Sequence, residues 1–416
     1  MSLNEDIKLL CQNAKEAAAR LALADTKTKN EALLKIADML SERAEEIVEA
    51  NLMDLERAEE NEVPLPMIDR LTLNVARIDG IAASLRNIAE LDDPVGKSEC
   101  WDRPSGLHIS RVRVPIGVVG IIYEARPNVT VDSAALCIKT GNAAVLRGGK
   151  EAINTNKALV AVIKDALDEC GLDPHCVELI ESTERESANI LMTMRGYIDV
   201  LIPRGGKGLI NSVVENATVP VIETGAGNCH IYIDESADMD MAVKVAMNAK
   251  CSRPSVCNAV ETILVHAAVA AKFLPAFAKE AEPYKLEIRG CPRTRVLVPG
   301  AIEATKEDYV TEYNDFIVAV KVVDTFSDAI SHINRYSTGH SEAIITNSEE
   351  NATRFCREIN SAAVYVNAST RFTDGGEFGF GAEIGISTQK LHVRGPMGLF
   401  ALTTEKYVIT GDGAIR

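Results

Sequence analysis

The sequence predicts an α/β protein with a parallel, doubly wound sheet followed by a second α/β block. Between residues 116 and 224, short β-branched runs alternate with segments of helix length such as TNKALVAVIKDALDEC. Each such helix carries the chain back to the edge of the sheet where the strand began, so the strands run parallel. The expected strands are IGVVGIIY (116–123), AAVLRG (143–148), CVELIES (176–182), IDVLIP (198–203) and VPVIET (219–224).

Residues 2 to 92 are expected to be helical. Ser2 with Glu5 and Thr28 with Glu31 have the spacing of capping boxes, in which a hydroxyl and a carboxylate bond reciprocally to backbone N–H groups. Apolar residues then recur at helical intervals, at Ile36, Met39, Leu40, Ile47 and Val48. The turn-rich stretch PVGKSECWDRPSG (94–106) marks the expected end of this region.

The second α/β block begins after Gly225. Its expected helices cover residues 238–250 and 268–280, and its expected strands are CHIYID, ETILVHA, RVLVPG and FIVAVKVV. The turn SRPSVCNAV lies between the first helix and ETILVHA. The segment STRFTDGGEFGFGAEIGIS (369–387) is irregular and rich in glycine, which suits a loop that lines a site. The last segment, EKYVITGDGAIR, predicts a terminal strand.

Charge and hydropathy narrow the possible partners. The 416-residue chain has a formal net charge of -16, from 60 acidic and 44 basic residues. This charge repels nucleic acids and anionic lipids, so we expect no nucleic acid and no membrane as a partner. The longest apolar run, VPIGVVGIIY, is shorter than the roughly 20 residues needed to span a bilayer, and the N-terminus has no signal-peptide pattern. We expect a cytoplasmic protein.

The ten cysteines are scattered, with no CxxC pair and no cysteine–histidine cluster at zinc spacing. Neither a disulfide framework nor a metal site is therefore expected. Cys257 is the best candidate for a nucleophile, because it lies in a turn and Arg253, four residues earlier, is a cation that favours the thiolate. The alternative for any one of the cysteines is a small residue of the core.

Two glycine pairs follow expected strands, in LRGGKEA (146–152) and PRGGKGL (203–209). At the carboxyl end of a strand, glycine lets the backbone approach a phosphate, and a helix N-terminus supplies unpaired N–H groups. Both edges are thus candidate nucleotide sites, although the usual GxGxxG fingerprint is absent. The alternative is a pair of glycine-rich turns with solvated charges.

Asn128 follows the first expected strand, in EARPNVTVDSAA (124–135). A side-chain amide at this edge can donate a hydrogen bond to a developing oxyanion. The alternative is an asparagine that caps a helix starting near Thr130.

From residue 1 to about 405, the order of six segments closely resembles the γ-glutamyl phosphate reductases of the aldehyde dehydrogenase superfamily. The segments are EARPNVT, GNAAVLRGG, IPRGGKGL, VIETGAGNCHIYID, RPSVCNAVET and VDTFSDAISHINRYSTGHSEAI. The resemblance implies an aldehyde dehydrogenase-like fold with a cofactor domain, a catalytic domain and a small oligomerisation arm. The implied parts are N-terminal helices that pack on the cofactor domain (1–94), an arm (95–115 and 400–416), the NADP-binding domain (116–225), the catalytic domain (226–370) and a site loop that returns to the cofactor domain (371–399).

The resemblance also implies the roles of individual residues. Cys257 would form a thioester with the γ-acyl group of the substrate, and Asn128 would bind the oxyanion beside the backbone N–H of Cys257. NADP(H) is the implied cofactor. Its implied binding residues are Arg147, Gly148 and Lys150 near the adenosine, Arg204, Gly205 and Gly206 near the pyrophosphate, and Glu312 at the nicotinamide ribose.

Other polar residues of these segments are assigned less directly. Glu223 stands where hydrolytic aldehyde dehydrogenases activate water, but a reductase of acyl phosphates needs no such base, so we expect Glu223 to be structural or to line the site. His332 and His340 are expected in polar loop or capping roles. The candidates for holding the substrate's α-amino and α-carboxylate groups, with surface or capping roles as the alternative, are Arg126, Arg253, Ser369, Thr370 and Arg371.

The implied activity is the NADPH-dependent reduction of L-glutamyl 5-phosphate to glutamate 5-semialdehyde, the second step of proline biosynthesis from glutamate. The alternative within the superfamily is a CoA-acylating aldehyde dehydrogenase, and the alternative of another class is a non-catalytic nucleotide-binding scaffold. The implied partners are a small-molecule substrate, further copies of the chain in a dimer or tetramer, and glutamate 5-kinase in a transient contact.

Overall fold

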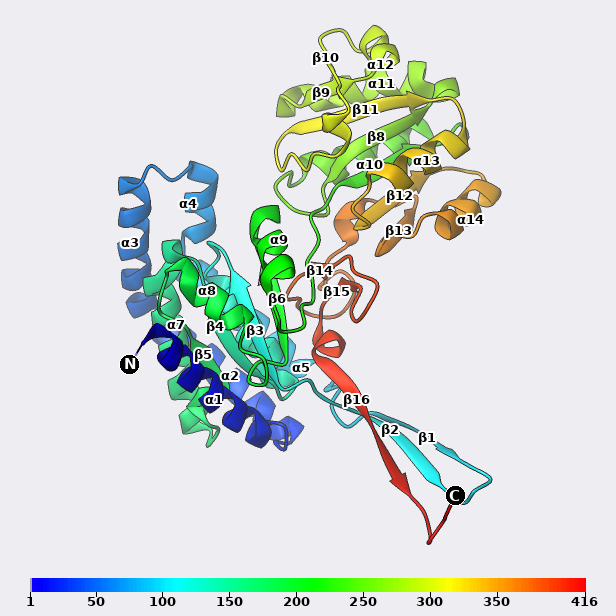
Figure 1. The fold of residues 1–416 in the computed structure, drawn as a ribbon. Helices are drawn as coiled ribbons and strands as arrows, with labels where there is room; N and C mark the ends of the chain where they lie inside the picture. Colours follow the sequence, from blue (N-terminus) through cyan, green and yellow to red (C-terminus); the bar gives the residue numbers. More distant parts are fainter. Residues whose placement is uncertain (1) are drawn as a thin grey trace. The chain divides into compact units, whose positions relative to one another are not determined.

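The computed structural model describes residues 2–416, shown as a ribbon in Figure 1. The chain forms two compact units, and neither unit is one continuous segment. Unit 1 runs to Thr224 and adds Gly379–Gly385 and Met397–Arg416, whereas unit 2 comprises Gly225–Phe378 and Ile386–Pro396.

Unit 1 contains a four-stranded parallel sheet. The order of its strands is β5 (Val177–Leu179), β4 (Ala143–Arg147), β3 (Val118–Tyr123) and β6 (Val200–Arg204). Every residue of β3 is buried, as expected for the central strand of a doubly wound sheet. The parallel sheet predicted for this region is confirmed.

The fifth predicted strand, VPVIET (219–224), is wrong. Only one parallel bridge forms beside β6, between Leu201 and Val221. Leu201 donates its N–H to the carbonyl of Pro220 at 2.8 Å, and Ile222 donates to the carbonyl of Leu201 at 2.9 Å. Pro220 and Pro203 have no N–H to donate, so the ladder extends in neither direction.

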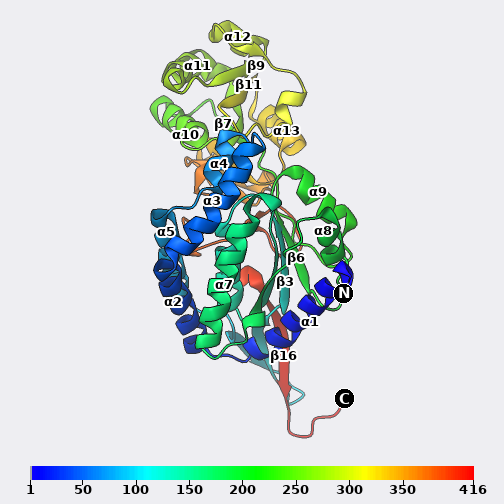
Figure 2. The ribbon, with the colours of Figure 1, turned by 90° about the vertical axis from the view of Figure 1, so that its left-hand side faces the viewer.

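Helices cover both faces of this sheet. The helices that connect or follow its strands are α6 (Asn128–Lys139), α7 (Ile153–Glu169), α8 (Arg185–Met192) and α9 (Lys207–Asn216). In Figure 2, α2 and α5 lie on one side of β3 and β6, and α8 and α9 lie on the other side. The N-terminal helices are α1 (Leu3–Leu21), α2 (Thr26–Glu42), α3 (Ala44–Glu60), α4 (Leu65–Leu71) and α5 (Val75–Glu90).

The start of α1 is the predicted capping box, because Ser2 accepts from the N–H of Glu5 while the Glu5 carboxylate accepts from the N–H of Ser2. The second predicted capping box, at Thr28 and Glu31, is wrong. Helix α2 begins earlier, and Asp25 caps it by accepting from the N–H of Thr28 at 2.8 Å. Aspartate is as good an N-cap as serine, and here it lies one turn before the predicted position.

Unit 1 also has a three-stranded antiparallel sheet. Its order is β1 (Ser98–Asp102), β2 (His108–Pro115) and β16 (Thr403–Thr410), so the last strand of the chain pairs with one that lies far earlier. Nearly all residues of β1 and β16 are exposed, including Trp101 and Tyr407, whose rings meet edge to face. The predicted terminal strand is confirmed up to Thr410.

Unit 2 is built on a seven-stranded parallel sheet. The order of its strands is β10 (Ile302–Glu303), β9 (Glu287–Gly290), β11 (Ile317–Val323), β8 (Val260–His266), β7 (Cys229–Ile233), β12 (Ser341–Ile345) and β13 (Ala363–Val366). Its helices are α10 (Met239–Cys251), α11 (Ala267–Ala281), α12 (Pro292–Leu297), α13 (Phe326–Tyr336) and α14 (Glu349–Glu358). A two-stranded antiparallel pair, β14 (Ile386–Ser387) and β15 (Gly395–Pro396), completes this unit.

Alternating side chains give the sheet of unit 2 two cores. Ile231 and Ile263 pack with Phe273 on the face covered by α10 and α11. Tyr232 and Leu264, their neighbours in sequence, pack on the opposite face with α13 and α14. This period of two is the geometric consequence of an extended strand.

The predicted strand RVLVPG is wrong. Residues Pro292–Leu297 form the short helix α12, with Pro292 in its first turn and the N–H of Val298 bonded to the carbonyl of Thr294 at 2.9 Å. Val296 is 81% exposed, so the apolar run does not enter the sheet. Proline is favoured at the start of a helix because its missing N–H has no helical partner there.

Among the helices of residues 2–416, none combines the length and the apolar composition required to span a bilayer.

Candidate active site

The turn that carries Cys257 connects α10 to β8 in unit 2, as predicted, and the Cys257 side chain is partly exposed. The next residue, Asn258, is 5% exposed and anchors this turn. Its side-chain amide donates to the carbonyls of Arg371 at 3.2 Å and Thr373 at 2.9 Å. The hydroxyl of Thr370 donates in return to the carbonyl of Asn258 at 2.7 Å. Segment 370–373 therefore fixes the backbone beside the candidate nucleophile.

The backbone of Cys257 also packs directly on the loop that precedes β7. A Cβ atom added to Gly227 would lie 1.5 Å from the carbonyl oxygen of Cys257 and 2.7 Å from its Cα. The thiol of Cys229 donates to the same carbonyl at 3.2 Å. Burial raises the pKa of Cys229 well above its usual value, so this residue remains a protonated donor.

Cys251, the nearest competing thiol, has a different environment. It is the last residue of α10, and it is buried. Burial raises its pKa to about 11, which leaves few thiolates at neutral pH. Cys251 therefore suits packing better than nucleophilic attack. Within residues 2–416 no disulfide forms, and no group of cysteine, histidine and carboxylate side chains could hold a metal ion.

Two arginines lie at the Cys257 turn. The guanidinium of Arg371 donates to the side-chain oxygen of Asn258, and its Nε donates to the hydroxyl of Ser252 at 3.3 Å. Burial lowers the pKa of Arg371, and the charge of Arg253 lowers it further, whereas a thiolate at Cys257 would raise it. Arg253 itself is exposed. The structure thus brings together three of the predicted site residues, Cys257, Arg253 and Arg371.

Ser369 and Thr370 are packed inside unit 2. They are 4% and 0% exposed. The hydroxyl of Ser369 caps a short 3-10 helix by accepting from the N–H of Arg371 at 3.3 Å. Both residues therefore support the Cys257 turn and its arginine, which is the capping alternative considered for them.

Glu312 is held at the same loop as Gly227. Its carboxylate accepts from the N–H of Gly227 at 2.8 Å. Glu312 is partly exposed.

His332 and His340 are both buried. The expected loop or capping role is wrong for His332, which does not lie in a loop, whereas His340 lies in the loop between α13 and β12, as expected. His332 lies within α13 with its ring against Tyr309 and Tyr336, and burial lowers its pKa to about 3. His340 is fully buried beside Ser341, whose hydroxyl lies 2.8 Å from its Nδ1. The lowered pKa keeps the buried ring of His332 neutral at physiological pH, and this ring belongs to the core of unit 2.

In unit 1, Asn128 is the first residue of α6, so the interpretation as a helix cap is wrong. Pro127 occupies the cap position, and no side chain caps this helix. The amide of Asn128 instead donates to the carboxylate of Asp132, one turn later, at 3.1 Å. Asn128 is partly exposed. Sequence reasoning missed Asp132, although residues four apart on a helix often form such a pair.

Arg147 is tied to the segment between β5 and α8. Its guanidinium donates to the carbonyls of Thr183 at 2.8 Å and Glu184 at 3.0 Å, and to the hydroxyl of Ser187 at 3.3 Å. Burial lowers its pKa. The next residue, Gly148, is required by packing, because a Cβ atom there would lie 2.3 Å from the side-chain nitrogen of Asn156. Lys150, in contrast, is exposed.

The PRGGKGL edge forms the N-terminus of α9. Gly206 is the N-cap, and its N–H donates to the carboxylate of Glu124 at 2.9 Å. A Cβ atom on Gly205 would lie 2.6 Å from the carboxyl carbon of the same glutamate. An anion therefore already lies on this helix N-terminus, which is the environment that a phosphate group also prefers. Sequence reasoning missed Glu124, which directly follows β3.

The remaining predicted residues are Arg126, Arg204 and Glu223, all of unit 1 and all partly buried. The carbonyl of Arg126 accepts from the N–H of Val129 at 3.0 Å. Arg204, at the end of β6, lies close enough to Asp132 for its charge to lower the pKa of that carboxyl.

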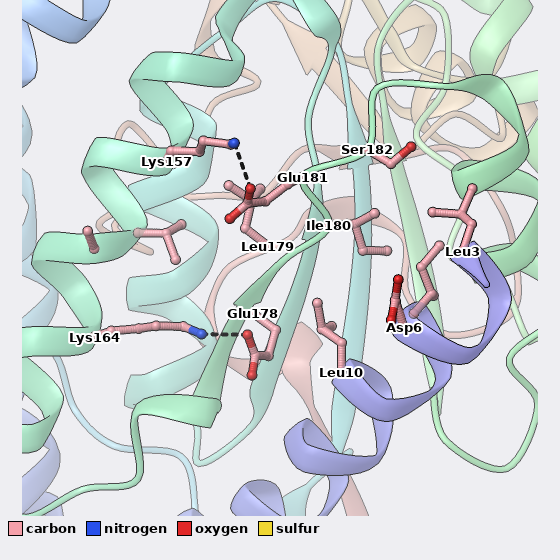
Figure 3. Close-up of a pocket in the computed structure, with 13 residues that line it drawn as sticks. Leu3, Asp6, Leu10, Lys157, Lys164, Glu178, Leu179, Ile180, Glu181 and Ser182 are labelled. Carbon is pink, nitrogen blue, oxygen red and sulfur yellow. Dashed lines mark hydrogen bonds and ion pairs between the residues drawn. The ribbon is translucent and has the colours of Figure 1, made fainter. Parts of the chain in front are cut away.

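A cavity of about 540 Å³ lies elsewhere in unit 1, between α1, α7 and the edge strand β5 (Figure 3). Two ion pairs lie in its lining, Lys157 with Glu181 at 2.6 Å and Lys164 with Glu178 at 2.5 Å. Its lining includes none of the site residues predicted from the sequence. The cavity is therefore distinct from the candidate site.

Comparison with known proteins defines the class of this fold. The model of the aldehyde dehydrogenase family matches residues 2–315 and 303–383. An acetylating aldehyde dehydrogenase from Geobacillus thermoglucosidasius superposes with a TM-score of 0.72 at 16% identity, covering 100% of this chain and 98% of that one. The predicted aldehyde dehydrogenase-like fold is confirmed.

More similar relatives place the chain within that class. A γ-glutamyl phosphate reductase from Carboxydothermus hydrogenoformans is 57% identical over 413 residues, which is 99% of this chain and 100% of the relative. The crystal structure of γ-glutamyl phosphate reductase from Thermotoga maritima has a TM-score of 0.96 and 52% identity, and the match covers 99% of each chain. The chain therefore belongs to the aldehyde dehydrogenase family and, within it, to the γ-glutamyl phosphate reductases.

Proposed function

We propose that this protein reduces L-glutamyl 5-phosphate to glutamate 5-semialdehyde and inorganic phosphate with NADPH, through a thioester on Cys257. This reaction would be the second step of proline biosynthesis from glutamate. The observation that carries the proposal is the construction of the Cys257 turn. Cys257 is partly exposed, while its backbone is fixed by Gly227, Cys229 and the Asn258 network.

This arrangement supports the covalent step that we propose. The thiolate of Cys257 attacks the acyl carbon, a tetrahedral oxyanion forms, and phosphate departs with the electrons of the broken C–O bond. We assign the stabilisation of this oxyanion to the side-chain amide of Asn128 and the backbone N–H of Cys257. Bound NADPH would supply the hydride that converts the thioester into a hemithioacetal, whose collapse releases the aldehyde and regenerates the thiolate.

The residues of unit 1 fit a dinucleotide with phosphate groups. The N–H of Gly206 at the N-terminus of α9 already binds a carboxylate, so it is competent to bind a phosphate oxygen in exchange. Lys150 is exposed and is the residue to which we assign the 2′-phosphate of NADP(H). Arg147 supports this edge indirectly, because its guanidinium is already bonded to two carbonyls and a hydroxyl. In unit 2, Glu312 is assigned to the nicotinamide ribose.

Arg253 is the residue that we assign to an anionic group of the substrate. Arg253 is exposed, whereas Arg371 beside it is already bonded to Asn258 and Ser252. The α-carboxylate and the phosphate are the substrate's two anionic groups. Arg126 is assigned to the same task in unit 1. A dimer or tetramer is also proposed, since the exposed sheet of β1, β2 and β16 resembles the oligomerisation arm of the superfamily.

The proposal is tested in the reverse direction, in which the semialdehyde is oxidised to the thioester. Microscopic reversibility then requires inorganic phosphate to release the acyl group. We expect sustained formation of NADPH from NADP⁺ only with phosphate or arsenate, and a single burst without them. Coenzyme A replacing phosphate would identify a CoA-acylating enzyme. Sustained turnover in a buffer without phosphate, arsenate or coenzyme A would identify a hydrolytic enzyme, with Glu223 as its base.

A further inference from the structure

We infer that Asp132 is a positioning residue that sets the orientation of the Asn128 carboxamide. The two residues lie one turn apart on α6, with 3.1 Å between Nδ2 of Asn128 and Oδ2 of Asp132. The inference rests on the proposed function, because it matters only if Asn128 binds the oxyanion.

The chemistry of the pair explains why a carboxylate is suited to this task. A carboxamide can rotate by half a turn and exchange its oxygen and its nitrogen, and only the nitrogen can donate to an oxyanion. An ionised carboxylate accepts hydrogen bonds but cannot donate them, so it selects the orientation in which the nitrogen faces it. The amide nitrogen of Asn128 carries two hydrogens, and the bond to Asp132 uses one of them. The second hydrogen is thereby held in a fixed direction for the reaction.

The surroundings of Asp132 favour a fixed hydrogen bond with Asn128 over exchange with solvent. Asp132 is partly buried, and the neighbouring residues Val131 and Ser133 are fully buried. Burial raises the pKa of Asp132 to about 6, while the bond from Asn128 and the charge of Arg204 lower it. Asn128 on the same helix and Arg204 at the end of β6 are thus the polar groups that act on this carboxyl. At pH 8 the carboxyl is ionised and fixes the amide.

A purely structural pair on α6 would have the same geometry, so the experiment must separate the two roles. The variants are Asp132→Ala, Asn128→Ala, the double variant, and Asp132→Asn, which keeps an acceptor oxygen at the same position. Their kcat, KM and NADP⁺ affinity are measured at pH 8 in the phosphate-dependent oxidation, together with thermal unfolding.

We expect Asp132→Ala to lower kcat at least about tenfold, a part of the 10²- to 10³-fold cost of removing an oxyanion donor altogether. KM and cofactor affinity should stay within about twofold. Asp132→Asn, which keeps an acceptor oxygen but can also present a donor, should lower kcat by less than Asp132→Ala does. In the Asn128→Ala background, Asp132→Ala should change kcat by less than about twofold, since a residue that acts through Asn128 has nothing left to orient.

Equal effects of Asp132→Ala with and without Asn128 would overturn the inference, as would an unchanged kcat in Asp132→Ala alone. If Asp132→Ala does not fold, Asp132→Ser, whose hydroxyl is too short to reach Asn128, takes its place in the cycle. A normal kcat in Asn128→Ala would overturn both the oxyanion assignment and this inference, while the requirement for phosphate would continue to support the reaction itself.

Discussion

Gly227 and Cys257 are in backbone contact, so close that the position of Gly227 excludes any side chain. A Cβ atom there would lie 1.5 Å from the carbonyl oxygen of Cys257 and 2.4 Å from its carbonyl carbon. Backbone atoms cannot move aside to make room for a Cβ atom as the end of a flexible side chain can. The loop that binds Glu312 and the turn that carries the nucleophile therefore form one rigid piece within unit 2.

Gly227→Ala should displace the Cys257 turn and lower kcat by about 10²-fold or more, because a shift of about 1 Å in a reacting group has this cost. Overpacking should also destabilise the protein by about 1–3 kcal/mol. The matched control is Gly80→Ala in α5, where no atom lies within 4 Å of the added methyl group. That variant should keep its activity and unfold at an equal or higher temperature. A wild-type kcat in Gly227→Ala would show that the Cys257 turn can move without loss of activity.

Cys257→Ala should abolish turnover while NADP⁺ binding, measured by fluorescence, stays unchanged. Cys251→Ala should remain active and lose only about 1 kcal/mol of stability, because its thiol is buried and protonated. The check is alkylation by iodoacetamide with and without substrate, followed by peptide mapping. Substrate protection at Cys251 would identify the other thiol as the nucleophile.

Lys150 and Arg147 should differ when each is replaced by alanine. Lys150→Ala should weaken NADP⁺ binding and leave NAD⁺ binding nearly unchanged, since Lys150 is exposed and is assigned to the 2′-phosphate. Arg147→Ala should lower the free energy of unfolding by about 1–3 kcal/mol, because it removes the partner of two carbonyls and a hydroxyl. Urea unfolding and titration with both cofactors measure these effects. A selective loss of NADP⁺ affinity in Arg147→Ala alone would reverse the two assignments.

Asp132 should also make stability depend on pH. Its pKa is raised from the ordinary 3.8 to about 6 in the folded state, so the folded protein binds a proton more tightly than the unfolded chain does. The favourable contribution is complete below pH 3.8 and is lost as the pH rises through 6. Asp132→Asn should therefore raise the unfolding temperature at pH 8 more than at pH 5. A larger gain at pH 5 would mean that the folded state favours the ionised carboxylate.

Periodicity predicted most elements of the fold, because strands and helices repeat their apolar residues every 2 and 3.6 residues. It failed at RVLVPG, where Val296 and Leu297 end a short helix and Val296 faces solvent. Pattern alone does not separate a strand from a helix in so short a run. VPVIET failed for a different reason, since Pro220 and Pro203, one on each segment, end the ladder on both sides of its single bridge.

The candidate site was predictable where its residues are close in sequence. Asn128 and Cys257 could each be predicted from a single motif. The spacing of four residues could also have indicated the hydrogen bond between Asn128 and Asp132. Asn258 could not have been assigned in this way, because its partners Arg371 and Thr373 lie 113 and 115 residues later. The resemblance implies that Arg147 binds the cofactor, and only the structure shows the carbonyls that it binds.

The pairing of β2 with β16 has a consequence for folding during synthesis on the ribosome. Strand β2 ends at Pro115, and its partner begins only at Thr403, after all seven strands of the sheet of unit 2 have been synthesised. Until then one edge of β2 has unpaired N–H and C=O groups, which are the groups that recruit strands from other chains. Synthesis of unit 1 therefore begins first and is completed last. A nascent chain that stops before Thr403 leaves one edge of β2 unpaired.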